Sequence, residues 1–143
     1  MTTPGTPDAS DPFTPQARHL AVVSGGSGDP SQTRMLAERM AESASAALSE
    51  HGVVPQIHLI TLRELATDIA QALVTSAISP ALRAALDEVA QADAVIAVSP
   101  TYKASYSGLF KSFWDLAEPT SVVGVPVLLG ATGGTARHSL MID

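Results

Sequence analysis

Glycines, hydroxyl groups and aromatic rings gather in short stretches of this chain, each directly after an apolar run. The first stretch, SGGSGDPSQT at 24–33, combines glycines with serine and threonine hydroxyls. Glycines let the backbone approach a ligand closely, and the free amides of a following helix start attract an anion such as a phosphate. A glycine turn with Ser31 or Thr33 as a helix cap explains the same letters equally well. The spacing differs from that of P-loop nucleotide triphosphatases and of the G-x-G-x-x-G dinucleotide fingerprint.

The second stretch, SPTYKASYSG at 99–108, follows the apolar ADAVIAV and places two tyrosines and a lysine near a proline. A plain connection from a strand to a helix needs only a turn and a cap. Tyrosine rings can flank a planar ligand, and threonine, lysine and backbone amides can bond to its heteroatoms. A third polar loop, ATGGTARHS at 131–139, follows the next apolar run.

Four apolar runs and the helical repeats between them predict an α/β fold. Continuous apolar strands that alternate with helices form a parallel sheet that is covered on both faces. Thr61 and Glu64 have the spacing of a capping box, which predicts a short helix after the second run. The predicted strands span 19–26, 53–60, 92–100 and 124–132, and the predicted helices begin near Pro30, Thr61, Pro80 and Ser107.

The predicted order of the strands brings the polar loops together. In open α/β sheets, ligands bind beyond the carboxyl ends of the strands, near a topological switch point. In a sheet of order 2-1-3-4, the polar loops follow the neighbouring strands one, three and four, and a plain turn follows the edge strand. The loops then surround one ligand that has a phosphate and a planar polar ring, and FMN fits this description best.

Composition and charge argue against several other classes of protein. The 143 residues are enough for one domain, and 45% of them are hydrophobic. A net charge of −6 argues against a nucleic-acid partner, and no apolar run reaches the roughly 20 residues of a membrane span. The absence of cysteine excludes thiolate metal sites, and the histidines are not spaced like metal ligands. We predict a disordered tail at 1–17, a domain at 18–143 and, without a secretory signal, a cytoplasmic location.

Together, the loops at 24–33, 100–115 and 131–139 resemble those of the NAD(P)H-dependent FMN reductases of the flavodoxin-like fold. The most specific part is the P-x-Y-K-x-S-Y-S-G-x-x-K pattern at 100–111. The most similar group in this family supplies reduced flavin to two-component monooxygenases. The resemblance implies a three-layer sandwich with sheet order 2-1-3-4(-5), a homo-oligomer in the full-length form and a monooxygenase partner.

The resemblance also implies the reaction and the residues that bind the ligands. NADPH or NADH would pass a hydride to FMN, and because the flavin carries this chemistry, no catalytic acid, base or nucleophile is assigned. No metal site is implied. The implied phosphate contacts are Ser24, Ser31, Gln32 and Thr33, and the implied ring contacts are Pro100, Thr101, Tyr102, Lys103, Thr132, Gly133 and Gly134.

Two departures from the family pattern and two alternative functions stay open. Many relatives carry an arginine at the position of Gly26, and relatives continue with a further strand and helix after 131–139. We therefore expect a chain truncated before a fifth strand, with the apolar run VPVLLGA at 125–131 as an uncovered sheet edge. The alternatives are a flavodoxin-type electron carrier that binds FMN without nicotinamide turnover, and an NAD(P)H quinone or azo reductase with bound FMN.

Overall fold

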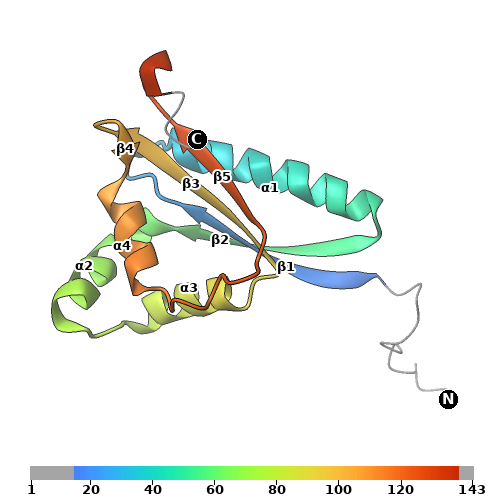
Figure 1. Cartoon of the computed structure of the whole chain (residues 1–143), viewed down its shortest axis with the longest axis horizontal. Helices are drawn as coiled ribbons and strands as arrows, with labels where there is room; N and C mark the ends of the chain where they lie inside the picture. Colours follow the sequence, from blue (N-terminus) through green and yellow to red (C-terminus); the bar gives the residue numbers. More distant parts are fainter. Residues whose placement is uncertain (1–14, 139–143) are drawn as a thin grey trace.

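The computed structural model describes residues 15–138, which form a parallel sheet between two layers of helices (Figure 1). The strand β1 (Gln16–Ser24) pairs with β2 (Val53–Thr61) on one side and with β3 (Ala94–Tyr102) on the other, and β5 (Val127–Thr132) pairs with β3. The order β2-β1-β3-β5 is therefore the predicted order 2-1-3-4. A short strand that the sequence did not predict, β4 (Ser105–Tyr106), pairs antiparallel with the end of β3.

The helix α1 (Gln32–Glu50) covers one face of the sheet, and α2 (Ala66–Thr75), α3 (Pro80–Ala90) and α4 (Gly108–Leu116) cover the other (Figure 1). Helices α1, α3 and α4 begin at serine caps, whose hydroxyls accept a hydrogen bond from a first-turn amide. The predicted cap at Thr61 makes no such bond, and the 3-10 helix η1 (Leu62–Leu65) precedes α2 instead. Within the described part of the chain, no single helix is long and apolar enough to cross a membrane.

The sheet separates two apolar cores because its central strands bury both of their faces. Val22 and Ile96 lie in the smaller core, where they pack under Ala41 of α1. Val23 and Phe113 lie in the larger core under α2, α3 and α4. These fully buried positions explain why the central strands read as continuous apolar runs in the sequence.

The first strand begins earlier than predicted. It starts at Gln16, inside the predicted tail of 1–17, and residues 1–14 lie outside the described residues. Its first residues are exposed and pair with β2 through the backbone, so apolar patterning could not reveal them. At this end, Asp93 accepts the amide of His19 at 2.8 Å and Arg18 Nη1 at 3.1 Å. These hydrogen bonds lower the pKa of the Asp93 carboxyl, with the bond from His19 as the larger cause.

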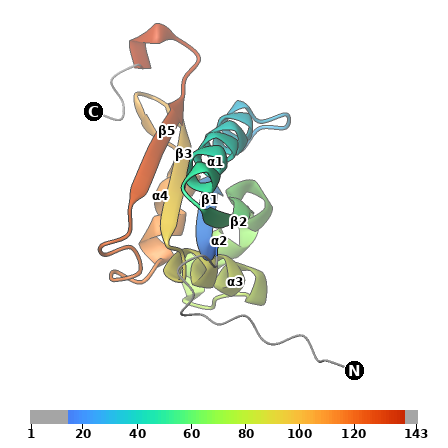
Figure 2. The same ribbon diagram turned by 90° about the vertical axis from the view of Figure 1, so that its right-hand side faces the viewer.

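The strand β5 lies at the outer edge of the sheet among the described residues (Figure 2). Val127, Leu128 and Leu129 are 45%, 51% and 52% exposed, respectively. The described part of the chain thus leaves an apolar edge of the kind expected from the sequence, and the further strand beyond it stays a prediction.

Candidate functional site

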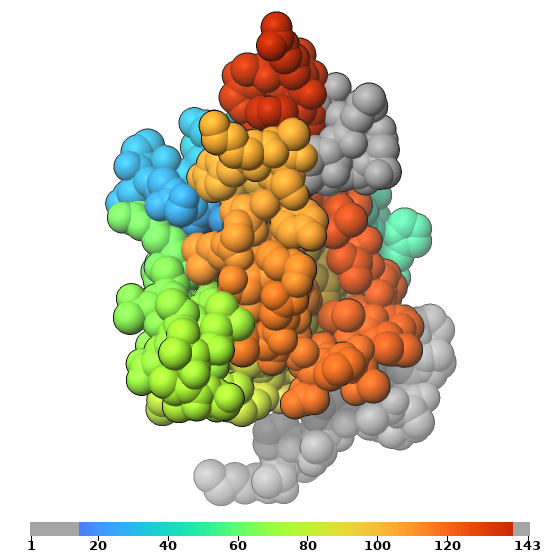
Figure 3. All heavy atoms as spheres, turned by 60° about the vertical axis from the view of Figure 1, so that its left-hand side comes forward, coloured from blue at the N-terminus to red at the C-terminus, as the bar shows by residue number. Residues whose placement is uncertain are grey.

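A cavity of about 290 Å³ lies beyond the carboxyl ends of β1, β3 and β5. The loops after these strands line it and meet at one end of the molecule (Figure 3). Nine of the eleven predicted contact residues line this cavity: Ser31, Gln32, Thr33, Pro100, Thr101, Tyr102, Thr132, Gly133 and Gly134. Ser24 and Lys103 are not among the lining residues. Four further residues that line the cavity are not among the predicted contacts: Gly26, Ser27, Gly28 and Pro30.

The first turn of α1 offers hydrogen-bond donors to the cavity. Ser31 Oγ accepts the amide of Arg34 at 3.1 Å, and this leaves the hydroxyl hydrogen of Ser31 free to donate to a ligand. Amides in the first turn, including those of Gln32 and Thr33, have no acceptor within the helix, and the helix dipole places positive charge there. The two interpretations of Ser31 are therefore compatible, because it both caps the helix and lines the cavity.

Gly26 lets the loop after β1 pack closely against this helix start. A Cβ atom at position 26 would lie 2.4 Å from Ser31 Oγ and 2.9 Å from Thr33 Cβ, so a side chain requires the loop or the helix to move. Backbone strain is not the reason, since the φ angle of Gly26 lies outside the left-handed region. An arginine side chain at this position would not fit the present conformation of the loop.

Buried serines behind the cavity connect the loop after β1 to β3 and α4. The amide of Gly25 donates to the carbonyl of Val98 at 2.8 Å, and Ser107 Oγ donates to the carbonyl of Gly25 at 3.1 Å. The amide of Ser107 donates to Ser99 Oγ at 2.9 Å, and Ser107 Oγ accepts the amide of Phe110 at 3.2 Å. These bonds hold the ends of β1 and β3 together. The sequence predicts a helix start near Ser107 but does not indicate this network, because a hydroxyl after an apolar run is too common a signal.

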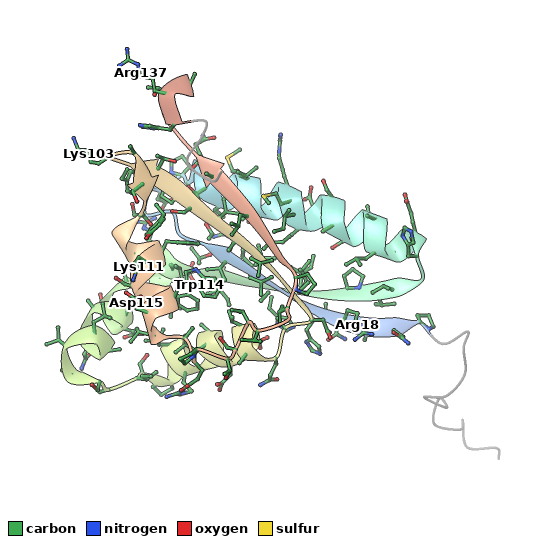
Figure 4. All side chains as sticks on the ribbon, in the orientation of Figure 1. Arg18, Lys103, Lys111, Trp114, Asp115 and Arg137 are labelled. Atoms are coloured by element: carbon green, nitrogen blue, oxygen red, sulfur yellow. The ribbon has the colours of Figure 1, made fainter. Side chains whose placement is uncertain are left out.

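Tyr102 is the last residue of β3 and forms one wall of the cavity. Its side chain is half exposed, and its hydroxyl lies 3.0 Å from Ser27 Oγ in the loop after β1. The next residues, Lys103 and Ala104, have φ angles of +53° and +60°, a conformation that costs roughly 1–2 kcal/mol per non-glycine residue. They form the tight turn between β3 and β4, and Lys103 points outward from its tip (Figure 4).

Two threonines place hydroxyl groups next to the cavity. Thr101 is buried, and its Oγ1 has no hydrogen-bond partner among the described residues. A buried hydroxyl without a partner costs on the order of 1–3 kcal/mol, which a polar ligand atom would offset. Thr132 Oγ1 lies 2.8 Å from Thr33 Oγ1, and one hydrogen of this pair is left to donate to a ligand. Both threonines can therefore form a hydrogen bond to a polar ligand in the cavity.

A neighbouring cavity of about 250 Å³, which shares part of the loop after β1, carries two arginines. Arg63 Nη1 lies 3.0 Å from Asp29 Oδ2, which connects the loop to η1. Arg34 Nε lies 2.9 Å from Glu38 Oε1, and this hydrogen bond raises the pKa of Arg34. Both guanidinium groups are therefore already paired with carboxylates. No motif in the sequence marks either arginine.

Within residues 15–138, no group of three histidine, aspartate or glutamate side chains is placed to hold a metal ion. His19 and His58 stack with ring centroids 5.5 Å apart, and His58 Nδ1 lies 3.1 Å from Glu88 Oε2. None of these three residues lines the cavity at the strand ends.

Comparison with known proteins places the chain among flavin reductases. The family model described as NADPH-dependent FMN reductase matches residues 19–143. The chain is 41% identical over 124 residues to the NADH-dependent FMN reductase SfnF of Pseudomonas putida. It is 36% identical over 124 residues to an FMN reductase (NADPH) of Pseudomonas aeruginosa. Each alignment covers 87% of this chain and 64% of the relative, so the chain spans less than two thirds of the length of these relatives.

Solved structures show the same architecture. An oxidoreductase from Corynebacterium diphtheriae matches with a TM-score of 0.86 and 37% identity, over 90% of this chain and 70% of that chain. The apo form of the NADH:FMN oxidoreductase EMOB matches with a TM-score of 0.75 and 31% identity, over 88% of this chain and 64% of that chain. The chain therefore belongs to the NADPH-dependent FMN reductase family and has the flavodoxin-like fold.

Proposed function

We propose that the protein binds FMN in the cavity beyond β1, β3 and β5 and reduces it with NADH or NADPH. The observation that supports this proposal best is the convergence of three polar loops, whose predicted contact residues line one cavity. The family membership of the chain also supports it. When bound, FMN supplies a ring that accepts a hydride from the nicotinamide.

In this proposal, the start of α1 binds the phosphate. The amides of Gln32 and Thr33 and the hydroxyls of Ser31 and Thr33 donate to the phosphate oxygens, and the helix dipole favours the negative charge. Because Gly26 has no side chain, these donors are neutral groups rather than a guanidinium. Ser24 stays a predicted phosphate contact, although it is buried and does not line the cavity.

The ends of β3 and β5 orient the ring. Pro100 and Tyr102 provide apolar and aromatic surface, and the buried hydroxyl of Thr101 gains a polar partner when the ring binds. Thr132 and the glycines at 133–134 line the same cavity from the loop after β5, where small residues allow close approach of the backbone. The protein then needs no proton donor of its own, and its role is to hold and orient the two ligands.

Turnover with free flavin distinguishes this enzyme from an electron carrier. Purified protein is mixed with excess FMN and with NADH or NADPH in turn, and the absorbance of the nicotinamide is followed. Repeated turnover is the expected result. A single stoichiometric reduction, or none, with tightly held FMN would instead indicate a flavodoxin-type carrier. Turnover with a quinone or an azo dye but not with free FMN would indicate an NAD(P)H quinone or azo reductase with bound FMN.

We further propose that the reduced flavin leaves the protein and supplies a partner monooxygenase. The resemblance of the pattern at 100–111 to such reductases supports this step. A flavin-dependent monooxygenase that hydroxylates its substrate only when this protein, FMN and NADH or NADPH are all present would be the expected result. The homo-oligomer of the full-length form and the cytoplasmic location stay predictions.

A further inference from the structure

One hydrogen bond joins two walls of the cavity that come from distant parts of the chain. Ser27 Oγ lies 3.0 Å from the hydroxyl of Tyr102, 75 positions further along the sequence. Both residues line the cavity, Ser27 from the loop after β1 and Tyr102 from the end of β3. The phosphate side and the ring side of the proposed FMN site are therefore in direct contact at this point.

Tyr102 has few other constraints on its side chain. The residue is 50% exposed, so its ring is not fixed by a packed core on all sides. A half-exposed side chain samples several rotamers unless a specific bond selects one, and each lost rotamer costs entropy. The turn of Lys103 and Ala104 restrains the backbone next to Tyr102, and the bond to Ser27 restrains the exposed end of the ring.

The position of the Ser27 side chain also depends on its hydrogen bond to Tyr102. It lies between Gly26 and Gly28 in an exposed part of the loop, and its hydroxyl is bonded to Tyr102 and to no other side chain among the described residues. Deeper in the loop, Gly25 is held by its bonds to Val98 and Ser107. The bond to Tyr102 therefore restrains Ser27, which the buried network does not reach, while the ion pair between Asp29 and Arg63 restrains the loop two residues further on.

We propose that Ser27 is a positioning residue for FMN, which holds the ring of Tyr102 as a preformed wall of the cavity. In return, Tyr102 holds Ser27 in the phosphate loop, so this hydrogen bond, beside the one between Thr33 and Thr132, couples binding of the phosphate to binding of the ring. This inference rests on the proposed function, because it requires that FMN occupies this cavity. It adds a residue that acts through Tyr102 rather than by contact with the flavin.

A double-mutant cycle on FMN binding tests this role. Ser27→Ala and Tyr102→Phe each remove one hydroxyl and keep the rest of the wall, and each should weaken FMN binding by about three- to tenfold, the range of one hydrogen bond. Because both variants remove the same bond, the double variant should bind FMN no more weakly than the weaker single variant. Ser27→Thr keeps the hydroxyl and should restore wild-type affinity. Ser105→Ala, which changes an exposed serine on β4, is the control and should leave the affinity unchanged.

The possible outcomes separate the inference from the function on which it rests. Additive losses, unchanged affinity in Ser27→Ala, or failure of Ser27→Thr to restore binding would overturn the positioning role while FMN binding by the wild type stands. A wild-type protein that binds no FMN would overturn the proposed function and this inference together. A non-additive cycle with rescue by threonine is the result expected from the structure.

Discussion

Replacement of Gly26 by alanine tests whether the loop after β1 packs against α1 as tightly as the structure indicates. The added Cβ would lie 2.4 Å from Ser31 Oγ and 2.9 Å from Thr33 Cβ. Ser31 Oγ can move only by losing its bond to the amide of Arg34, and the loss of a serine cap costs roughly 1 kcal/mol. Thr33 Cβ can move only with the helix backbone, which breaks its bond to Thr132 at a cost of about 1 kcal/mol. We therefore expect the free energy of unfolding to fall by about 2 kcal/mol.

Gly28→Ala is the matched control in the same loop. A Cβ atom at position 28 would meet only the carbonyl oxygen of Pro30 at 3.4 Å, which is an ordinary contact. Its effect on the free energy of unfolding should stay within about 0.5 kcal/mol. Urea unfolding of both variants measures the difference. If Gly26→Ala unfolds at the same urea concentration as Gly28→Ala, the packing argument is refuted.

The same substitution should also change ligand binding. The Cβ added at position 26 displaces Ser31 and Thr33, which are the proposed phosphate donors, and leaves the ends of β3 and β5 in place. Gly26→Ala should therefore weaken FMN binding more than riboflavin binding. Titration of both flavins against the variant and the wild type measures this ratio, and equal losses for the two flavins would contradict the assignment of the loop to the phosphate.

Three further substitutions test single features of the structure. Ser31→Ala should lower the affinity for FMN about tenfold more than that for riboflavin in parallel titrations, since it removes a donor to a charged group. Asp93→Asn tests the carboxyl whose pKa is lowered by His19 and Arg18. Because this pKa is lower in the folded state, Asp93 stabilises the fold above its ordinary pKa of about 3.9, and this contribution is lost as the pH falls through the folded-state value. Urea midpoints of the wild type should therefore fall more steeply in acid than those of the asparagine variant, and parallel curves would contradict the assignment. Ala104→Gly removes a Cβ from a residue with φ of +60°, so the free energy of unfolding should rise by up to about 1 kcal/mol. A lower free energy of unfolding in urea titrations would show that the turn is not strained.

The strands could be predicted because they depend on local patterns, whereas the strand order came from the resemblance to the flavodoxin-like reductases, and the place of the site followed from that order. Val22 and Val23 face opposite cores, and such a run without alternation indicates a central strand. The serine caps at the starts of α1, α3 and α4 also lie where the sequence placed helix starts. In a parallel sheet, loops after neighbouring strands share one end, so the position of the cavity follows from the strand order.

The features that could not be predicted depend on contacts between distant segments. Nothing in the sequence selects Ser27 rather than another serine as the partner of Tyr102. The strand β3 continues through Tyr102 because its end pairs with both β5 and β4, and this pairing is set by tertiary register. The turn at Lys103 and Ala104 lacks the glycine or asparagine that usually marks a two-residue hairpin, so β4 left no local signal.

The phosphate end of the site bears on whether FMN is a substrate or a tightly held cofactor. Gly26 places no charged side chain at the site, and Arg34 and Arg63 are paired with Glu38 and Asp29. Hydrogen bonds from a charged donor are roughly twice as strong as those between neutral groups, so amides and hydroxyls hold a phosphate less tightly than a guanidinium does. Weaker retention suits the proposed reductase, whose flavin must leave after reduction, and is unfavourable for an electron carrier. The glycine that lets the loop pack on α1 also contributes no cation to the proposed site, so loop packing and flavin exchange are linked at one position.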